Sequence, residues 1–338
     1  VLTTSTRARL ETPLLLCLGL VCMGATLSMA ASKTSLASPV RTRVSSSRLV
    51  ASASSSRRNA VRRIAGAMGT VAFASSASAG AAPGEPDMDM AKNPRVYFVQ
   101  EPDVKSIKRT DPSSSSERHN LIQNVQYPKE SPFIPSDFKR YDETPDPQFY
   151  LQPRFVTHID DKAIEALTQY YSSSFPTGKP SKTEILDLCS SWISHYPTDF
   201  MPAKAVGLGM NAAELKENKQ LTSYVVQDLN VEPKLPFPDN SFDYVTNVVS
   251  VDYLSRPTEI FSEIHRVLKP GGKLINSFSN RCFPTKAIDL WLKTQDWTHL
   301  LIVAQYFKIA GFADPVAYDI TLKNGHDPMY IVEAIKEK

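Results

Sequence analysis

The chain has 338 residues, of which 42% are hydrophobic and 22% are charged, as is ordinary for a globular protein with a sizeable core. Its formal net charge of +3 is unevenly spread. Residues 1–79 contain ten Lys or Arg and one Glu, a net charge of +9, so the rest of the chain carries −6. Nucleic-acid binding needs clustered Lys and Arg, and the acidic body has no basic stripe. We therefore expect no nucleic-acid partner.

Residues 1–79 have the composition of a targeting leader. No Asp or Glu occurs between Thr12 and Gly84, and Ser, Ala and Arg dominate, which is typical of an organelle transit peptide. Paired arginines, a weakly apolar run over 64–73 and the pattern Ala77-Ser78-Ala79 then resemble a twin-arginine thylakoid-transfer signal, with cleavage after Ala79. We expect a chloroplast protein of the thylakoid lumen. A single transit peptide that ends in the stroma is the alternative.

A further apolar stretch, 13–30, is too short for a transmembrane helix. It is either an endoplasmic-reticulum signal or part of an upstream translation artefact before Met29, and we favour Met29 as the true start. We expect no integral membrane segment in the mature chain.

Residues 80–151 are predicted to form an extended, partly disordered arm, because ten prolines interrupt any periodic pattern. Some aromatic side chains of this arm are expected to pack against the body, namely Tyr97, Phe98, Phe133, Phe138 and Tyr141.

Residues 152–338 alternate predicted strands and helices. Strands are predicted at 185–188, 204–208, 223–226, 244–249 and 273–278, and helices at 162–171, 212–217, 257–268, 285–293 and 297–310. Asp160 or Asp161 is expected to cap the first helix. The segments PVAYDITL and MYIVEAI predict a closing antiparallel pair. This alternation predicts an α/β fold with a mostly parallel central sheet and helices on both faces.

Residues 235–275 carry the most specific motifs. LPFPDNSFDYV leads into a strand, and EIHRVLKPGGKLI reads as helix, turn and strand. This segment resembles the central part of class I S-adenosylmethionine-dependent methyltransferases, in the small-molecule branch often called type 11. The resemblance implies a Rossmann-like sheet with its last strand inserted antiparallel. It also implies S-adenosylmethionine at the carboxyl ends of the first strands and methyl transfer to a small molecule.

The resemblance implies three cofactor contacts, of which one is intact. The turn after the first strand lacks the expected glycines. Glycines there would allow positive φ and a close approach of the backbone to the cofactor. The resemblance implies that the second strand ends in an acid that binds the ribose hydroxyls, but Gly209 stands at that position. An acid restored at Gly209 is expected to strengthen cofactor binding. Asn211 can offer an amide to a ribose hydroxyl. Asp228 is kept for the adenine. The lost contacts predict binding weakened about ten- to a hundredfold. The cofactor candidates are Asp187, Cys189, Ser190, Ser191, Gly209, Met210, Asn211, Asp228 and Leu229. For Asp187, an equally favoured alternative to cofactor binding is that the side chain only caps the turn.

The substrate candidates are Asp252, Tyr253, His195 and Arg154. Tyr253 either stacks on a planar substrate or only packs against other side chains. For His195 we favour a solvent-facing side chain. Arg154 and His158 precede the first helix, where this fold often has a substrate lid, although a packing arm is favoured.

Cys189 and Cys282 are the cysteines of the mature chain. We favour Cys189 as a small buried residue over a nucleophile, because no paired His can be shown. A disulfide between the two is not expected, since strands one and five are not neighbours in this fold. No metal site is expected, because neither has a Cys or His at ligand spacing.

The sequence therefore predicts a methyltransferase-like protein. The alternative is a non-catalytic protein that uses the same fold as a binding or assembly module of the thylakoid lumen, with a thylakoid protein as partner.

Overall fold

The structure is a computed structural model in which residues 89–90, 92–100 and 108–338 are described. The chain divides between Ala79 and Gly80 into two units, and all described residues belong to the second. The predicted leader, its cleavage site and Met29 lie outside the described residues, as do residues 80–88, 91 and 101–107 of the predicted arm.

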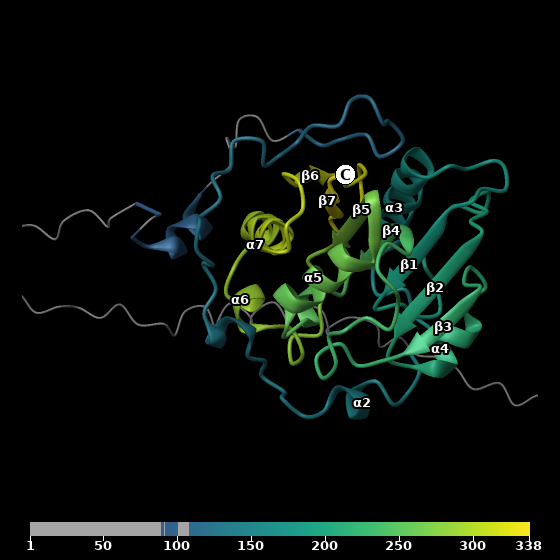
Figure 1. Cartoon of the computed structure of the whole chain (residues 1–338), viewed down its shortest axis with the longest axis horizontal. Helices are drawn as coiled ribbons and strands as arrows, with labels where there is room; N and C mark the ends of the chain where they lie inside the picture. Colours follow the sequence, from purple (N-terminus) through teal and green to yellow (C-terminus); the bar gives the residue numbers. More distant parts are fainter. Residues whose placement is uncertain (1–88, 91, 101–107) are drawn as a thin grey trace, which may run out of the picture. The chain divides into compact units, whose positions relative to one another are not determined.

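Seven strands form one sheet in the order β3-β2-β1-β4-β5-β7-β6 (Figure 1). Strands β1 to β5 pair in parallel, whereas β7 runs antiparallel to both β5 and β6. The predicted α/β fold with an inserted antiparallel last strand is confirmed. The strands are β1 (Glu184–Leu188), β2 (Lys204–Gly209), β3 (Ser223–Val226), β4 (Phe242–Val248), β5 (Leu268–Phe278), β6 (Val316–Asp319) and β7 (Tyr330–Ile335).

Helices cover both faces of this sheet. On one face α5 and α7 join a core with β1, β4 and β5, and on the other α3 packs with β1, β6 and β7. Asp160 caps α3, because its carboxylate accepts the Ala163 N–H at 2.8 Å. The helices are η1 (Pro94–Val99), η3 (Pro135–Phe138), α2 (Asp146–Phe149), α3 (Asp161–Ser174), α4 (Ala212–Glu217), η4 (Val251–Tyr253), α5 (Pro257–Val267), α6 (Asp289–Leu292) and α7 (Asp296–Ile309).

The helix predicted at 285–293 is wrong over its first half, because only α6 is helical there. The preceding backbone bonds to other segments instead. Thr285 accepts an N–H from Asp142 of the arm at 2.8 Å, and Ile288 donates to the Asp252 carbonyl at 2.9 Å and bridges with Arg140. These long-range bonds override the local helical pattern.

The connection from β1 to β2 has no helix, although parallel neighbours are usually joined by one. Polar side chains hold residues 189–203 instead. Asn218 donates to the Ser191 carbonyl at 3.0 Å and to Ser194 Oγ at 2.9 Å, and Gln220 donates to the Tyr196 carbonyl at 2.7 Å. The path of this crossover therefore depends on a buried hydrogen-bond network.

The described part of the arm packs on the body. Tyr97 is fully buried and donates to the Leu301 carbonyl of α7 at 2.8 Å, and the Phe133 ring lies 5.0 Å from that of Tyr306. Figure 1 shows the last part of the arm passing by α6 to α2. Tyr141 is 87% exposed, so the expectation that it packs was wrong.

A second contact joins the arm to the opposite face of the sheet. Arg118 donates to the Tyr170 hydroxyl at 3.0 Å and forms an ion pair with Glu333 of β7 at 3.7 Å. The Tyr170 hydroxyl donates to the same carboxylate at 2.7 Å. The arm is thus tied to both α3 and β7.

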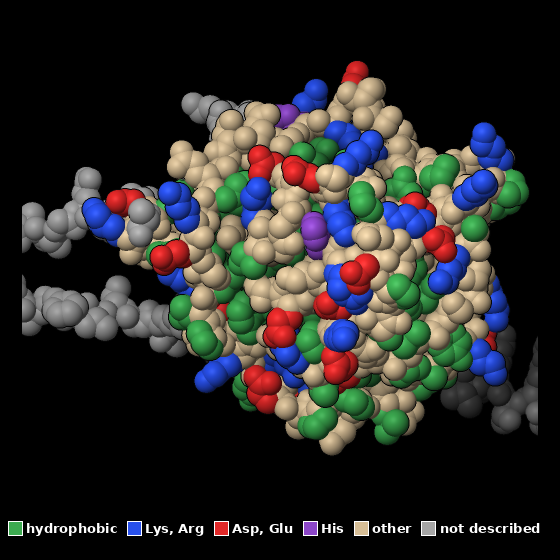
Figure 2. Space-filling view, in the orientation of Figure 1, with side chains coloured by type: hydrophobic (Ala, Val, Ile, Leu, Met, Phe, Trp, Pro, Cys, Tyr) green, Lys and Arg blue, Asp and Glu red, His purple; other side chains and the backbone are tan. Residues whose placement is uncertain are grey.

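The face drawn in Figure 2 intersperses acidic and basic side chains. Over the described part of the chain, no helix is long and apolar enough to cross a membrane.

We predict that Gly209→Ala destabilises the fold by about 1–3 kcal/mol, the usual cost of overpacking. A Cβ at Gly209 would lie 2.1 Å from the Ser190 carbonyl oxygen, a backbone atom that cannot move aside cheaply. Gly325→Ala is the matched control, since its Cβ would meet nothing closer than 3.3 Å. Urea unfolding measures both free energies. Equal losses in the two variants would contradict this packing.

Candidate functional site

A cavity of about 570 Å³ lies at the carboxyl ends of the parallel strands. The strand order changes direction between β1 and β4, and ligands of open α/β sheets bind at such a switch point. Its walls come from the segments that follow β1, β2, β3, β4 and β5, together with the arm and the chain before α3. The volume lies within the range of small-molecule sites.

Most predicted site residues meet at this cavity. All nine cofactor candidates line it, and so do the substrate candidates Tyr253, His195 and Arg154. Asp252 does not line it.

Asp187, at the end of β1, is the polar centre of the turn. Its carboxylate accepts hydroxyl bonds from Ser190 at 2.6 Å, Ser194 at 2.7 Å and Thr246 at 3.2 Å. Burial raises its pKa to about 6, although these donors favour the charged form. The carboxylate therefore holds the turn while it also lines the cavity.

Cys189 lies in the turn after β1, which lacks the expected glycines, and it adopts the backbone conformation that glycine would supply, with a φ of 56°. Burial raises the pKa of its thiol to about 12, so the thiol is protonated near neutral pH. Both described cysteines are free, and both line the cavity.

Asn211 does not offer a free amide, contrary to the sequence-based expectation. Its side-chain oxygen caps α4 by accepting from Ala213 and Glu214. Its amide donates to the Tyr150 carbonyl at 2.8 Å and to the Leu151 carbonyl at 3.3 Å. The side chain joins the arm to α4.

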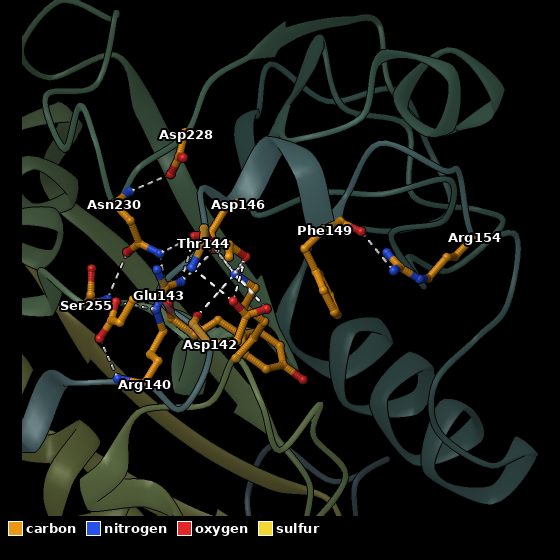
Figure 3. A network of polar contacts seen from close by, with 12 residues as sticks. Arg140, Asp142, Glu143, Thr144, Asp146, Phe149, Arg154, Asp228, Asn230 and Ser255 are labelled. Carbon is orange, nitrogen blue, oxygen red and sulfur yellow. Dashed lines mark hydrogen bonds and ion pairs between the residues drawn. The ribbon is translucent and has the colours of Figure 1, made fainter.

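Beyond β3, Asp228 lies beside a buried ion network that fixes the arm (Figure 3). Asp146 of α2 accepts from Arg140 at 2.7 Å and from Asn230 at 2.8 Å, and Lys286 lies 3.2 Å away. Burial alone would raise the pKa of Asp146, but these donors hold it below its usual value. Partial burial raises the pKa of Asp228, one of whose oxygens accepts the Asn230 N–H.

The segment before α3 forms part of the cavity wall, as a substrate lid would, and it is also bonded to the body, as a packing arm would be. Arg154, Val156 and His158 line the cavity, and the Trp192 ring donates to the Val156 carbonyl at 3.0 Å. Glu214 of α4 accepts the Arg154 N–H at 2.7 Å. We call residues 150–159 the lid.

His195 is 7% exposed, so the solvent-facing interpretation is wrong. The helix-free crossover turns it inward with a φ of 58°, and Thr168 donates to its carbonyl. Burial lowers the pKa of its imidazole to about 4, and the nearby His158 acts in the same direction.

The expectation that Asp252 faces a substrate is also wrong, since it is 2% exposed behind the cavity wall. Burial raises its pKa to about 8. Its neighbour Tyr253 does line the cavity, and the Tyr253 hydroxyl accepts the Phe283 N–H at 2.8 Å.

Sequence reasoning missed many of the lining residues. Arg281 and Phe283 follow β5, and Asn230 follows β3, at the same edge as the other strand ends, a signal that strand order alone could have supplied. Asp146, Tyr150 and Glu214 depend on the path of the arm and of α4, which no local pattern reveals.

The donor set fits S-adenosylmethionine in part. Asp228 and the backbone at Gly209 and Met210 border the cavity where adenine and ribose are expected, and four carboxylates line it against two arginines, which favours a cation. Ser190, Ser191 and Asn211 already have protein partners. Among the described residues, no group of three or more His, Cys, Asp or Glu could hold a metal ion.

We predict that Cys189→Gly is more stable than Cys189→Ala by about 1 kcal/mol, because only glycine adopts positive φ without strain. Cys282, which has no positive φ, is the control, and there the alanine variant should be the more stable. Thermal unfolding of the four variants gives both orders. The same order at both positions would show that the left-handed backbone at Cys189 carries no strain.

Comparisons with known proteins agree with the fold expected from the sequence. Residues 190–276 match a family model described as a methyltransferase domain. A demethylmenaquinone methyltransferase of Listeria monocytogenes is 36% identical over 103 residues, 27% of this chain and 43% of the relative. A ubiquinone/menaquinone biosynthesis C-methyltransferase of a Ruegeria species is 37% identical over 67 residues, 20% of this chain and 26% of the relative.

The chain thus spans less than half the length of these curated relatives. Among solved structures, a Haemonchus contortus phosphoethanolamine N-methyltransferase in complex with S-adenosylmethionine has a TM-score of 0.37 at 16% identity, over 52% of each chain. Residues 190–276 of this domain thus match a methyltransferase domain, and the observed sheet has the antiparallel last strand that the resemblance implied.

Proposed function

We propose that this domain binds S-adenosylmethionine in the cavity and transfers its methyl group to a small molecule. One observation carries the proposal. The cavity lies at the switch point of the sheet, and the segment that matches a methyltransferase domain supplies its walls from the turn after β1 to the end of β4.

The bound cofactor would supply an electrophilic methyl group on a sulfonium. Asp228 would accept a hydrogen bond from the adenine amine, and the Gly209–Met210 backbone would border the ribose. The lid would exclude water from the reacting groups. Catalysis in this fold is largely positioning, and the buried contacts of the arm and crossover supply a fixed frame for it.

The substrate side favours a planar molecule. Tyr150, Trp192, Tyr253 and Phe283 line the cavity, and aromatic rings stack well on planar ligands. Two relatives are named for quinone methylation, which agrees with a planar substrate for this chain.

A non-catalytic binding or assembly role is the second candidate, and the turn after β1 is the observation that favours it. Its backbone folds onto β2, with Ser190 donating to the Leu208 carbonyl at 2.8 Å. The hydroxyls of Ser190 and Ser191 are taken up by protein carboxylates. Fewer polar groups of this turn therefore remain free to bind a cofactor than in a glycine-rich turn.

We predict that the full chain binds S-adenosylmethionine and S-adenosylhomocysteine in calorimetric titration, and that Asp228→Asn weakens this binding about ten- to a hundredfold. The substitution removes a charged hydrogen-bond acceptor but keeps the oxygen that accepts the Asn230 N–H.

Asp239→Asn is the control, because Asp239 is 70% exposed and pairs with Arg266 outside the cavity. Absence of heat with either ligand at millimolar concentration would exclude the methyltransferase function and favour the non-catalytic one. An effect of Asp239→Asn equal to that of Asp228→Asn would remove Asp228 from the binding site.

We further propose that the mature chain lies in the thylakoid lumen of a chloroplast, a proposal that rests on the sequence of residues 1–79 alone. Protease treatment of intact thylakoids is expected to leave the mature form undigested and to destroy it once the membranes are opened. Digestion in intact thylakoids would place the protein on the stromal side.

A further inference from the structure

Three aromatic rings surround one guanidinium at the cavity. The guanidinium carbon of Arg154 lies 4.5 Å from the ring centroid of Phe149, 5.5 Å from that of Phe283 and 5.8 Å from that of Tyr150. All three distances fall within the range of cation–π attraction. The rings also contact one another, since the Phe149 centroid lies 5.0 Å from that of Tyr150 and 5.3 Å from that of Phe283. We call these three rings the aromatic cage.

The cage is built from two segments that lie far apart in the sequence. Phe149 ends α2 and Tyr150 begins the lid, whereas Phe283 follows β5. The hydrogen bonds to Asp146 hold the start of α2, and the Tyr253 hydroxyl accepts the Phe283 N–H at 2.8 Å. Both segments are therefore held in place by contacts that do not involve Arg154.

The Arg154 side chain is poorly matched to this cage. Among the described residues its guanidinium donates one hydrogen bond, from Nη2 to the Phe149 carbonyl at 2.8 Å (Figure 3), whereas the buried Nη1 has no partner. A guanidinium has five N–H donors, and a buried donor without an acceptor costs free energy. A cation without N–H groups, such as a fully methylated ammonium or a sulfonium, keeps the attraction to the rings and avoids this cost.

The position of the cage allows such a cation to replace the guanidinium. Arg154, Tyr150 and Phe283 all line the cavity, so the space that the Arg154 side chain fills is continuous with it. Four carboxylates line the same cavity, and Arg154 supplies one of its two guanidinium charges. A cationic ligand in place of this side chain leaves the charge balance of the cavity unchanged.

We propose that Phe149, Tyr150 and Phe283 bind a small organic cation that has no N–H donor, and that the Arg154 guanidinium is a built-in occupant which this ligand displaces. The exchange requires only the side chain to move, because Glu214 holds the backbone N–H of Arg154 at 2.7 Å. The cage adjoins the site of the proposed function but does not rest on it, since cation binding requires neither the cofactor nor methyl transfer.

The probe is choline, whose ammonium group carries three methyl groups and no N–H. Its uncharged analogue dimethylbutanol has a carbon atom in place of the nitrogen, and ethanolamine has the charge together with N–H donors. In calorimetric titration of the full chain, choline is expected to bind at least about tenfold more tightly than either analogue. Equal binding of choline and either analogue, or no binding of choline at millimolar concentration, would overturn the proposal.

Arg154→Ala is expected to bind choline about fivefold or more tightly than the unaltered chain, because no occupant has to leave the cage. Arg281→Ala is the matched control. Arg281 also lines the cavity but pairs with Asp327 at 3.6 Å, so its removal changes the charge and leaves the cage filled. Choline binding that does not tighten in Arg154→Ala, or that tightens equally in Arg281→Ala, would show that Arg154 is not the displaced group.

Phe283→Leu is expected to weaken choline binding about fivefold, because leucine keeps an apolar side chain but removes the ring. Phe155→Leu is the control, since Phe155 is 50% exposed on the lid and does not line the cavity. Equal choline affinities of the two variants would remove Phe283 from the cage.

Two sources supply cations of this kind, the sulfonium of the cofactor and a separate small molecule. If the cofactor is the source, Arg154→Ala strengthens the binding of S-adenosylmethionine but not that of S-adenosylhomocysteine, whose sulfur is uncharged. If a separate molecule is the source, choline also binds to the chain saturated with S-adenosylhomocysteine. Either result supports the cage and identifies its ligand.

The same titrations separate this proposal from the proposed function. Binding of S-adenosylhomocysteine without a preference for choline would remove the cage and leave the methyltransferase function. A preference for choline without binding of S-adenosylmethionine or S-adenosylhomocysteine would leave the cage as the site of a non-catalytic binding protein.

Discussion

The carboxylate of Asp187 is the interaction on which the site depends. It ends β1 and accepts hydroxyl bonds from Ser190 and Ser194 of the crossover and from Thr246 of β4. The bonds from Ser190 and Ser194 help to hold a crossover from β1 to β2 that has no helix, and the bond from Thr246 ties the same carboxylate to the neighbouring strand.

A second buried carboxylate, Asp146, fixes the other wall. Arg140 and Lys286 place positive charges beside its carboxylate, and Asn230 connects it to the loop after β3. Removing one partner of such a group would leave an uncompensated buried charge, which costs far more than a surface ion pair. The arm is therefore part of the domain at this point. The arm and the crossover, which both contribute walls of the cavity, are thus each held by a buried carboxylate.

The sequence predicted the sheet well because its strands are short runs rich in apolar residues that alternate with helices and polar loops, so local pattern and tertiary structure agree. The sequence-based prediction failed where contacts with distant segments override the local pattern. The segment at 285–288 pairs with the arm instead of forming a helix, and His195 turns inward on a left-handed backbone. The cofactor candidates line one cavity because strand ends meet at one edge of a parallel sheet, and their role in cofactor binding stays a prediction. Their hydrogen-bond partners, as at Asn211, were beyond any single-sequence pattern.

The missing acid at Gly209 follows from the shape of the turn. A Cβ there would lie 2.1 Å from the Ser190 carbonyl, and Ser190 is fixed by Asp187 and by its bond to Leu208. An aspartate at Gly209 would require the crossover to move, so this packing opposes the expectation that an acid there strengthens binding, which stays a prediction. Any cofactor bound here would need a ribose contact from outside β2, and the buried Glu214 of α4 is a carboxylate that lines the cavity beyond that strand.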